Sequence, residues 1–474
     1  MTPNAMTRLD GGSTTLASAP TDALAKRFGD RLITPEDARY DQVRAIWNAM
    51  IDRRPSLILR CVDAEDVVQA VRFAHDHHLL MSVRGAGHNI AGNALSDGGL
   101  LVDLSLMKGV EVNAAARTAK VGPGVTLGEF DQATQAHGLA TPVGINSTTG
   151  IAGLTLGGGF GWLSRKYGLT IDNLISAEVV TAAGERVKAD AKQNPDLFWA
   201  IRGGGGNFGV VTSFEYRLHP VGPEVMAGLI VHPLAEARSV LKQYAELSQK
   251  APDELTVWAV LRKAPPLPFL PPEWHGKEIV VLAMCHAGTL EQAEKDVAPF
   301  RKIGKPIADV VGPAPYAGWQ TAFDPLLTPG LRNYWKSHNF PALPDEALDA
   351  LIRYTGTLPT PHCEIFIGQL GGAARRVAMD ATAYAQRDAA YVMNVHTRWE
   401  TPAEDAKCIA WARELFNTMK PFATGGVYVN FMPEDETERV ESAYGPNYRK
   451  LAELKRRFDP DNLFRLNQNI RPQS

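Results

Sequence analysis

The sequence predicts an α+β fold in which one chain forms two units with different patterns of secondary structure. Residues 56–83 have the pattern of a strand, a helix and a second strand, which is a β-α-β unit. After Pro220 the pattern changes to segments in which apolar and polar residues alternate, interrupted by proline-rich loops such as 264–272 and 313–315. That pattern predicts an antiparallel sheet with helices over about 220–420.

The first unit can be followed element by element. The segment SLILRCV (56–62) is a strand, and Asp63 can cap a helix over 64–77 that leads to a strand at 80–83. Thr126 and Glu129 form a T-x-x-E capping box for a short helix that stops at Gly138. Further strands are predicted at 99–103, 109–112, 118–121, 176–181 and 209–217.

The second unit and the tail have clear elements too. Strands are predicted at 278–284, 364–369 and 391–399, the last with the sequence YVMNVHTRW. The tail at 446–458 is a basic amphipathic helix, and the turn Asp459-Pro460-Asp461-Asn462 ends it. Its run Lys455-Arg456-Arg457 complements the helix dipole at the carboxyl end.

Composition excludes several classes of protein. A length of 474 residues suits two or three packed units, and the formal net charge of −3 argues against nucleic acid or an anionic membrane as the main partner. No run of about 18 apolar residues occurs, so no membrane span is expected. Residues 1–19, rich in Ser, Thr, Ala and Pro without an apolar stretch, are expected to be a disordered leader, and the cytoplasm is the expected location.

Metal and disulfide chemistry is not expected. Cys61, Cys285, Cys363 and Cys408 lie far apart and form no C-x-x-C pair. The cluster of His75, His77 and His78 has no carboxylate or Cys partner at a suitable spacing, so it is interpreted as a solvated helix end.

Glycines gather in three segments, at 84–89, 150–161 and 202–209. A dinucleotide fingerprint of the Rossmann type needs G-x-G-x-x-G between a strand and a helix. The segment from Gly85 lacks the third Gly, and the run from Gly203 leads into a strand, so that motif is not met. Successive free N–H groups can still cradle a pyrophosphate as an anion nest, and three such segments suit an extended dinucleotide.

Together these segments resemble a known family. The stretches SVRGAGHN (82–89), GLTLGGGFGWLSRKYGLTIDNL (153–174) and DLFWAIRGGGGNFGVVTSFEY (196–216) resemble the FAD-linked oxidases of the vanillyl-alcohol oxidase superfamily. The similarity is to the berberine-bridge-enzyme branch, especially to bacterial relatives of 6-hydroxynicotine oxidase. It also covers DGGLLVDLSLMKGV (97–110), VGPGVTLGEF (121–130), YVNF (428–431) and the tail at 444–470.

The resemblance implies a two-part FAD-binding domain of the vanillyl-alcohol oxidase type around an antiparallel-sheet-plus-helices substrate domain. The boundaries expected are 20–218 and 420–474 for the FAD part and 219–419 for the substrate domain. It implies FAD contacts from His88, Arg84, Gly85, Ala86, Gly87, Asn89, Gly92, Gly144, Thr148, Thr149, Gly150, Gly153, Leu154, Gly158, Gly161, Gly209, Val210, Val211, Asn467 and Asn469.

Covalent attachment of the flavin follows from the same resemblance. The His of R-G-A-G-H commonly bonds the flavin 8α-methyl group, which maps to His88. Many relatives add a second link through a Cys in G-x-C-P-T-x-G, but Asn146 stands at that position and cannot form a thioether. One covalent link, to His88, is therefore expected. Thr149 stands where relatives often have a Val or Ile oxygen gate, which leaves the electron acceptor open.

The position of the catalytic base departs from the family pattern. Relatives often use the second Tyr of Y-x-N-Y, and this chain has Tyr428-Val429-Asn430-Phe431, where Phe431 has no proton to exchange. Tyr428 and Asn430 are expected to line the flavin edge. Tyr334, from a YWKS segment, His396 and Tyr391 are the other candidates for the base.

The leading hypothesis is an FAD-dependent oxidase that takes hydride from an alcohol, amine or sugar-like small molecule to flavin N5 and passes electrons to O2, giving H2O2. A flavin dehydrogenase with another acceptor is an alternative. A flavin-binding protein without redox turnover is the third possibility, because the expected catalytic Tyr is missing.

Overall fold

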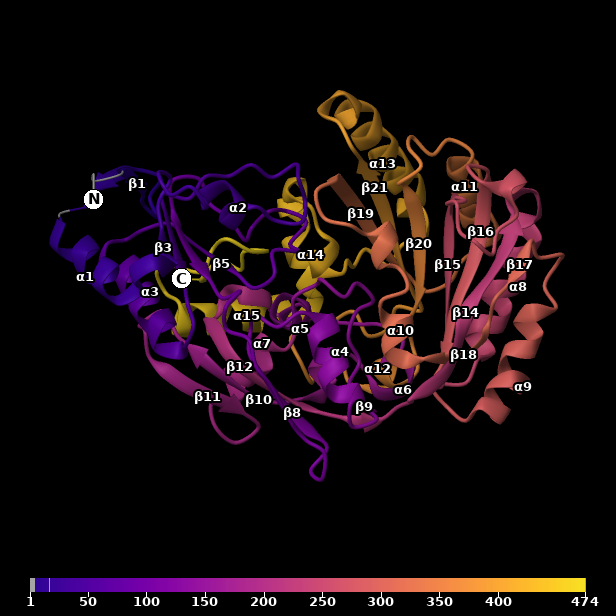
Figure 1. Cartoon of the computed structure of the whole chain (residues 1–474), viewed down its shortest axis with the longest axis horizontal. Coiled ribbons are helices and arrows are strands. Elements are labelled where there is room, and N and C mark those ends of the chain that lie inside the picture. Colours follow the sequence, from indigo (N-terminus) through magenta and orange to yellow (C-terminus); the bar gives the residue numbers. More distant parts are fainter. Residues whose placement is uncertain (1–4, 17, 474) are drawn as a thin grey trace.

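The computed structural model describes residues 5–16 and 18–473. The molecule has two halves, one built mainly from the first 220 residues and the other from the large sheet that follows (Figure 1). Several buried clusters of apolar side chains form the core, one centred on the large sheet and others in the first half.

Among the described residues, the first half contains two larger sheets besides two short two-stranded ones. One is mixed, with the strand order β3-β4-β6-β5, and has parallel pairs between β4 and β6 and between β5 and β6. The other has the order β11-β10-β12-β8-β7 and is antiparallel. Their strands are β3 (Leu32–Ile33), β4 (Leu57–Arg60), β5 (Met81–Arg84), β6 (Leu100–Asp103), β7 (Val110–Asn113), β8 (Thr118–Val121), β10 (Leu174–Val180), β11 (Arg186–Asp190) and β12 (Val210–Arg217).

Helices accompany these two sheets. Helix α3 begins after Asp63, whose side chain accepts a hydrogen bond from the Asp66 N–H, and α4 begins with the predicted capping box of Thr126 and Glu129. Both helix starts thus have the caps that the sequence predicts. The helices of this half are α1 (Ser18–Phe28), α2 (Tyr40–Arg44), α3 (Ala64–Asp76), α4 (Leu127–Gln135), α5 (Ile151–Leu156), α6 (Ser164–Tyr167) and α7 (Pro195–Ile201).

The second half is one antiparallel sheet of eight strands with the order β17-β14-β16-β15-β20-β21-β19, and β18 also pairs with β14. Its strands are β14 (Glu224–Pro233), β15 (Leu255–Lys263), β16 (Glu278–His286), β17 (Ala308–Asp309), β18 (Gly312–Pro315), β19 (Arg332–Phe340), β20 (Glu364–Gln369) and β21 (Tyr391–Trp399). One face packs on α8 (Ala237–Lys250), α9 (Leu290–Arg301), α11 (Asp345–Thr355) and α13 (Asp405–Met419). The other face is free of these helices.

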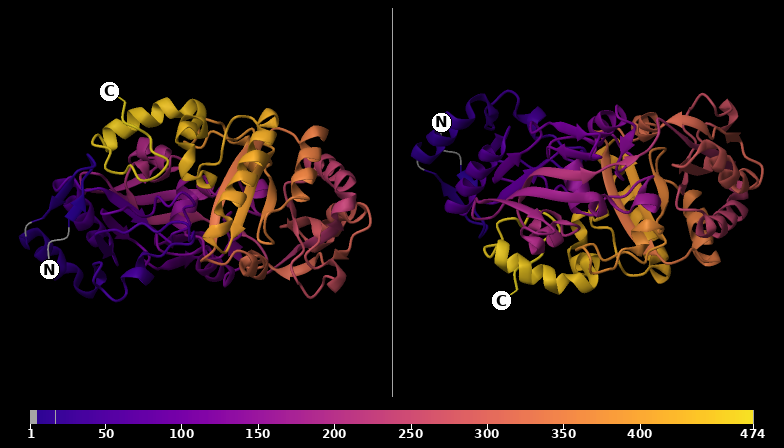
Figure 2. Two further views of the ribbon diagram at one scale, coloured as in Figure 1. Left: turned by 90° about the horizontal axis from the view of Figure 1, so that it is seen from above. Right: turned by 90° about the horizontal axis from the view of Figure 1, so that it is seen from below.

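The chain returns to the first half after α13. Figure 2 shows the C-terminal segment lying against the N-terminal half in views from both sides. Val427, Tyr444 and Leu451 share a buried cluster with Trp199 and Tyr216. The return segment contains α14 (Val440–Tyr444) and α15 (Tyr448–Phe458), and its YVNF residues form a 3-10 turn, Val429–Phe431, and no strand.

The N-terminal segment is ordered where the structure describes it, so the expectation of a disordered leader is wrong for residues 5–16 and 18–19. Strand β1 (Ala5–Thr7) pairs with β2 (Ser13–Thr15), and α1 starts at Ser18. Met6 is buried in the same cluster as Leu24 and Phe28. Backbone bonds from Thr7 to Gly98 and from Leu80 to Thr7 connect this hairpin to the first half. Residues 1–4 and 17 lie outside the described residues.

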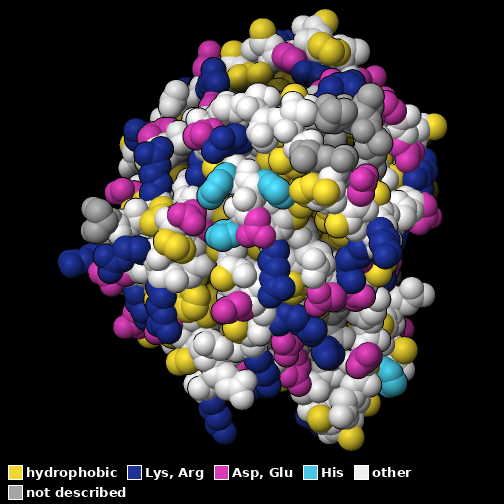
Figure 3. All heavy atoms as spheres, turned by 90° about the vertical axis from the view of Figure 1, so that its left-hand side faces the viewer, with side chains coloured by type: hydrophobic (Ala, Val, Ile, Leu, Met, Phe, Trp, Pro, Cys, Tyr) yellow, Lys and Arg dark blue, Asp and Glu magenta, His cyan; other side chains and the backbone are white. Residues whose placement is uncertain are grey.

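Acidic and basic side chains are interspersed over the face at the N-terminal end of the molecule (Figure 3). His75 pairs with Asp76 on this half of the chain, and its other nitrogen lies 3.9 Å from Asp461. Among the described residues no three His, Cys, Asp or Glu side chains group as a metal site, and no helix has the length and apolar character to cross a membrane.

Candidate active site

A cavity of about 390 Å³ runs between the two halves, lined by glycine-rich loops of the first half, the helix-free face of the large sheet and the return segment. Ligand sites of enzymes are typically such mostly apolar clefts between domains. At one end it reaches Met81, Val83 and Phe464, and at the other it reaches Leu267 and Phe269. The cavity therefore connects the glycine segments with the sheet of the second half.

The glycine segments give the cavity a wall of bare backbone. Gly85, Gly153, Gly205 and Gly206 all line it. A Cβ built on Gly153 meets nothing within 4 Å, and one on Gly206 meets only the Asn467 amide at 3.9 Å. Because no side chain of the protein fills this space, a ligand can approach the backbone closely there.

His88 lies in the wall of the same cavity, half-buried. Its Nε2 is 2.8 Å from the Thr148 hydroxyl and its Nδ1 is 3.3 Å from the Thr149 hydroxyl, while its ring stacks on Trp47 at a centroid distance of 5.1 Å. Desolvation lowers the pKa of His88 to about 3, so the imidazole is neutral at pH 7. A neutral imidazole has a nitrogen lone pair for bonding.

The return segment supplies three residues to the middle of the cavity: Tyr428, Asn430 and Phe431. The Tyr428 hydroxyl accepts hydrogen bonds from the Gly159 N–H at 3.1 Å and the Asn430 amide at 3.0 Å. Burial raises the pKa of Tyr428 to about 12, so this phenol stays protonated at pH 7. It can orient a substrate, but it is a poor base.

The large sheet supplies a polar group to the cavity wall: Arg262, Glu364 and His396. Arg262 donates to Glu364 Oε2 at 2.7 Å, and His396 Nδ1 lies 3.0 Å from Glu364 Oε1. Burial raises the pKa of Glu364, but the charge of Arg262 and the hydrogen bond from His396 outweigh it and bring this pKa to about 2. Glu364 is therefore a buried carboxylate at neutral pH.

Tyr334 and Tyr391 must be removed from the candidate bases. Successive side chains of a strand point to opposite faces, so Tyr391 and His396, an odd number of positions apart, lie on different faces of β21. The Tyr391 hydroxyl bonds Ser248 at 2.7 Å within the helix-covered core. Tyr334 likewise belongs to that face, where its hydroxyl donates to Asp435 at 2.6 Å and accepts from Arg413.

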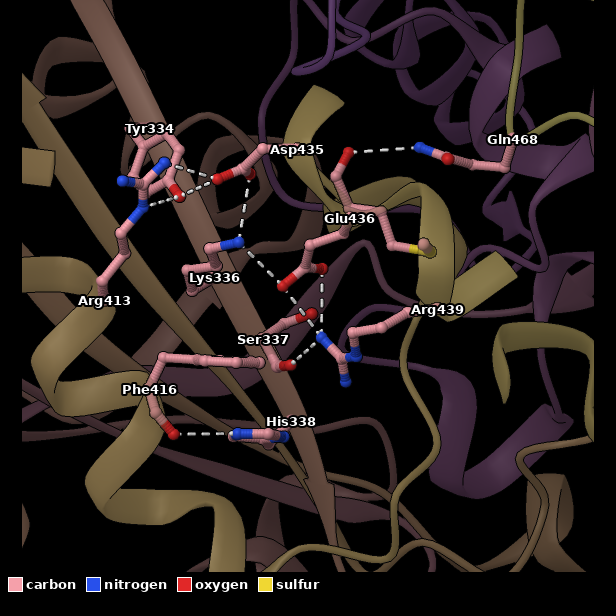
Figure 4. Close-up of polar contacts among 11 residues, drawn as sticks. Tyr334, Lys336, Ser337, His338, Arg413, Phe416, Asp435, Glu436, Arg439 and Gln468 are labelled. Carbon is pink, nitrogen blue, oxygen red and sulfur yellow. Dashed lines mark hydrogen bonds and ion pairs between the residues drawn. The ribbon is translucent and has the colours of Figure 1, made fainter. Parts of the chain in front are cut away.

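Tyr334 belongs instead to a polar network that fastens the return segment to the sheet (Figure 4). Lys336 donates to Asp435 and to the buried Glu436, both at 3.0 Å, and Arg439 also pairs with Glu436. These contacts hold Asp435, Glu436 and Arg439, which follow the YVNF segment in the chain. Their role in the site is therefore to position the return segment.

The other residues expected to contact the cofactor divide into two groups. Those that line the cavity are Gly85, Ala86, Gly87, His88, Asn89, Gly144, Thr149, Gly150, Gly153, Leu154, Gly209, Val210, Val211 and Asn467. Those that do not line it are Arg84, Gly92, Thr148, Gly158, Gly161 and Asn469.

Three residues of the second group support the cavity wall: Arg84, Thr148 and Gly161. Arg84 is buried in an ion pair with Asp103 at 2.8 Å, and Thr148 acts through its contact with His88. Gly161 allows a close packing of loops, because a Cβ there would lie 1.8 Å from the Val143 carbonyl oxygen. Arg84 and Gly161 thus stabilise the loops that carry the lining residues, and cofactor contact by the six residues of this group stays a prediction.

The cavity fits an FAD molecule by its own features. The open space at Gly153 is a cradle that a Cβ would fill. Asn467 lines the cavity, and its buried Oδ1 has no hydrogen-bond partner among the described residues. A buried amide oxygen without a partner is costly, so it points to a polar ligand group at this place.

Comparisons with known proteins agree with this fit. The family model described as "FAD binding domain" matches residues 55–190, and "Berberine and berberine like" matches residues 427–471. An FAD-linked oxidoreductase of Dictyostelium discoideum is 33% identical over 90% of this chain and 91% of its own length. The (R)-6-hydroxynicotine oxidase of Paenarthrobacter nicotinovorans is 32% identical over 93% and 96%.

Solved structures agree as well. The 6-hydroxy-D-nicotine oxidase of Arthrobacter nicotinovorans superposes with a TM-score of 0.83 at 30% identity, covering 93% of this chain and 98% of that one. The berberine-bridge-like protein 1 of Physcomitrella patens gives a TM-score of 0.86 at 26% identity over 96% and 100%.

The fold and the cavity thus define an FAD-dependent oxidoreductase with an α+β fold of the vanillyl-alcohol oxidase type, which confirms the predicted fold class. The chain belongs to the family of berberine-bridge-like, FAD-linked oxidoreductases.

Sequence reasoning missed several residues of the cavity. Trp47, Trp258, Phe160, Trp335 and Phe366 form much of its aromatic wall, and Arg262 and Glu364 complete its polar group. Gly205 and Gly206 could have been identified from the sequence, because they belong to the third glycine segment. Of the residues from the large sheet, Trp335 stands in the YWKS segment, whereas Trp258, Arg262, Glu364 and Phe366 belong to no motif.

Proposed function

We propose that this protein is an FAD-dependent oxidase acting on an alcohol, amine or sugar-like small molecule, with O2 as the electron acceptor. Bound FAD would accept hydride from a substrate carbon at N5 and pass two electrons to O2, giving H2O2. The observation that carries the proposal is the single cavity that joins the glycine cradle to Tyr428, Asn430 and the Glu364–His396 pair. The name of the 32% identical relative, (R)-6-hydroxynicotine oxidase, also supports an oxidase.

The chain's own residues would hold FAD and the substrate in defined ways. The bare backbone at Gly153, Gly205 and Gly206 would bind the cofactor closely, and the Asn467 amide would pair with one of its polar groups. Asn430 and Tyr428, locked to each other and to the Gly159 N–H, would form the fixed wall against which substrate lies. The surrounding aromatic side chains exclude water from the reacting atoms.

The oxidase proposal is tested by the fate of the reduced protein. Purified holoprotein is mixed without oxygen with a panel of alcohols, amines, phenols and sugars until one of them bleaches the yellow colour. After admission of air, we expect the colour to return at once with one H2O2 formed for each substrate consumed. Bleached protein that air leaves colourless while a dye acceptor reoxidises it would show a dehydrogenase. Failure of the whole panel to bleach the colour would favour a flavin-binding protein.

His88 is proposed as the single covalent attachment point of the flavin, at the 8α-methyl group. Its neutral ring, held by Thr148, Thr149 and Trp47, supports this assignment. We expect the yellow colour to stay with the acid-denatured pellet of the wild-type protein and to move into the supernatant for His88→Ala. The matched control is His75→Ala, a surface histidine of the same half. Wild-type colour found in the supernatant would contradict the link.

Thr149 bears on the choice of acceptor. The Thr149 hydroxyl lies 3.3 Å from His88 Nδ1, so this polar group has a hydrogen-bond partner within the protein. This contact supports O2 as the acceptor, since the rest of the threonine side chain is close in size to valine. A cytoplasmic location stays a prediction from the sequence.

A further inference from the structure

Four side chains form one row across four neighbouring strands on the cavity face of the large sheet. The strand register places Arg262 of β15 opposite Glu364 of β20, Glu364 opposite His396 of β21, and His396 opposite Trp335 of β19. Directly opposed residues of an antiparallel pair have side chains close enough to interact. All four also line the cavity. The row is thus a fixed feature of the sheet and does not depend on a loop.

The hydrogen bond between Glu364 and His396 determines which imidazole nitrogen of His396 carries the proton. Glu364 is an ionised acceptor, so the proton of a neutral His396 is on Nδ1, which donates to Oε1 at 3.0 Å. The lone pair is then on Nε2. This nitrogen is shielded from water and has no hydrogen-bond partner among the described residues. Leaving such a nitrogen unpaired in a buried place is unfavourable, and a ligand O–H or N–H would supply the missing hydrogen bond.

The ring of His396 is also held in place from its two faces. Trp335 stacks on it at a centroid distance of 4.5 Å and 28°, and Phe366 lies parallel to it at 6.1 Å. Phe431 meets its edge at 6.4 Å. No donor of these neighbours or of Tyr428 lies within hydrogen-bond distance of Nε2 among the described residues. The proton that fits Nε2 must therefore come from a ligand.

Charges near the row favour a negatively charged ligand oxygen or nitrogen. The single carboxylate of Glu364 is accompanied by the guanidinium groups of Arg262 and Arg398. Burial lowers the pKa of Arg398 to about 10, which still leaves it charged at neutral pH. The balance is one positive charge in excess beside His396, and such a field stabilises an anion that has lost its proton to the imidazole.

Beyond the row the cavity is apolar. Strands β14, β15 and β16 and the loop between β15 and β16 line this end with aliphatic and aromatic side chains: Leu229, Val231, Val260, Leu267, Phe269, Leu270, Ile279 and Val281. A sugar carries hydroxyl groups on every side and would leave them unpaired against such a wall. An apolar ligand with one acidic O–H or N–H satisfies both the wall and His396.

We propose that His396, oriented by Glu364, is the base that removes the substrate proton, and that the substrate is an apolar alcohol or secondary amine with a single such proton and a hydrogen on the carbon next to that oxygen or nitrogen. The inference rests on the proposed function, which supplies FAD as the two-electron oxidant. The substrate O–H or N–H bond breaks and its proton moves to Nε2. The electron pair of that bond forms the new double bond to carbon as the carbon loses its hydride.

The experiment follows the proton directly and needs no turnover. The probe is 4-nitrophenol, an apolar aromatic ring with one acidic proton, whose anion absorbs visible light and whose neutral form does not. It is titrated into yellow holoprotein at a pH where most of the free probe is protonated, and difference spectra report the ionised fraction. We expect bound probe to be ionised at least tenfold more than free probe.

Variants assign the effect to the pair. His396→Asn keeps a side-chain donor for Glu364 but has no basic nitrogen, so we expect the probe to bind and remain neutral. Glu364→Gln weakens the orientation and charge of the imidazole, and an intermediate ionised fraction is expected. His362→Asn is the control, because His362 and Glu400 form a His–Glu pair at 3.3 Å on the surface. We expect it to match the wild type.

The outcomes separate this inference from the proposed function. A probe that binds without ionising, or that His396→Asn ionises as well as the wild type does, overturns the base. A probe that does not bind overturns the apolar substrate class. A bleaching substrate, once found, gives a second readout: a loss of about 10²–10⁴-fold in the rate of anaerobic bleaching by His396→Asn is expected of a general base. Dithionite bleaching and peroxide release test the flavin and the oxidase independently of the row.

Discussion

Replacing Asp459 by alanine is expected to lower the free energy of unfolding by about 3–5 kcal/mol, because it leaves a buried ammonium group without its counter-charge. Lys455 and Asp459 are both fully buried and pair at 2.6 Å across one turn of α15. Asp459 also accepts hydrogen bonds from the Leu463 and Phe464 N–H groups at 2.7 and 2.9 Å. The variant thus loses an ion pair and the anchor of the turn that follows the helix.

Urea unfolding followed by circular dichroism measures this loss. The control comes from the same helix: Arg449 and Glu453 form a pair with the same spacing at 3.3 Å, but their side chains are 86% and 55% exposed. Glu453→Ala should change stability by about 0.5 kcal/mol or less. Equal effects of the two variants would show that burial does not set the strength of the Lys455–Asp459 pair.

Gly153→Leu is expected to abolish FAD binding while the protein stays folded. A leucine side chain would extend into the open space beside Gly153 that we assign to the cofactor. Gly153 lies inside α5, where leucine is favoured over glycine by roughly 0.5–1 kcal/mol, so the helix itself gains stability. The expected result is colourless protein with wild-type circular dichroism, measured as the ratio of flavin to protein absorbance.

Gly109→Leu is the matched control for this variant. A Cβ at Gly109 also meets nothing within 4 Å, but this glycine does not line the cavity. We expect a full flavin content there. Yellow Gly153→Leu protein would place the cofactor elsewhere, and unfolded protein would show that the space serves packing.

The sequence predicted the parts of this molecule that depend on short segments. Asp63 and Thr126 cap their helices, and the strand at 391–399 has the predicted bounds, because these features are set by neighbouring residues. The loop around His88 was found for the same reason. Lys455 shows the limit: its basic run is interpreted from the sequence as complementing the helix dipole, but the burial of Lys455 beside Asp459 was not predicted. Its partner groups, the carbonyls of Asn207 and Phe464, are brought to it by the tertiary fold.

The polar row could not be predicted because it depends on strand pairing. Arg262, Glu364 and His396 stand side by side only after β15, β20 and β21 have taken their order and register. A shift by one residue would turn each side chain to the other face, and no local pattern fixes that choice. The inclusion of Tyr391 among the bases is an error of this kind.

The return of the chain to its first half has a consequence for the order of events during synthesis. The cluster that holds Trp199 and Tyr216 is closed by Val427, Tyr444 and Leu451, which leave the ribosome roughly 200 residues later. At about 5–20 residues per second this interval lasts on the order of 10–40 s. For that time the nascent first half exposes apolar surface and an incomplete glycine cradle, so a chaperone has a target there and flavin loading follows translation.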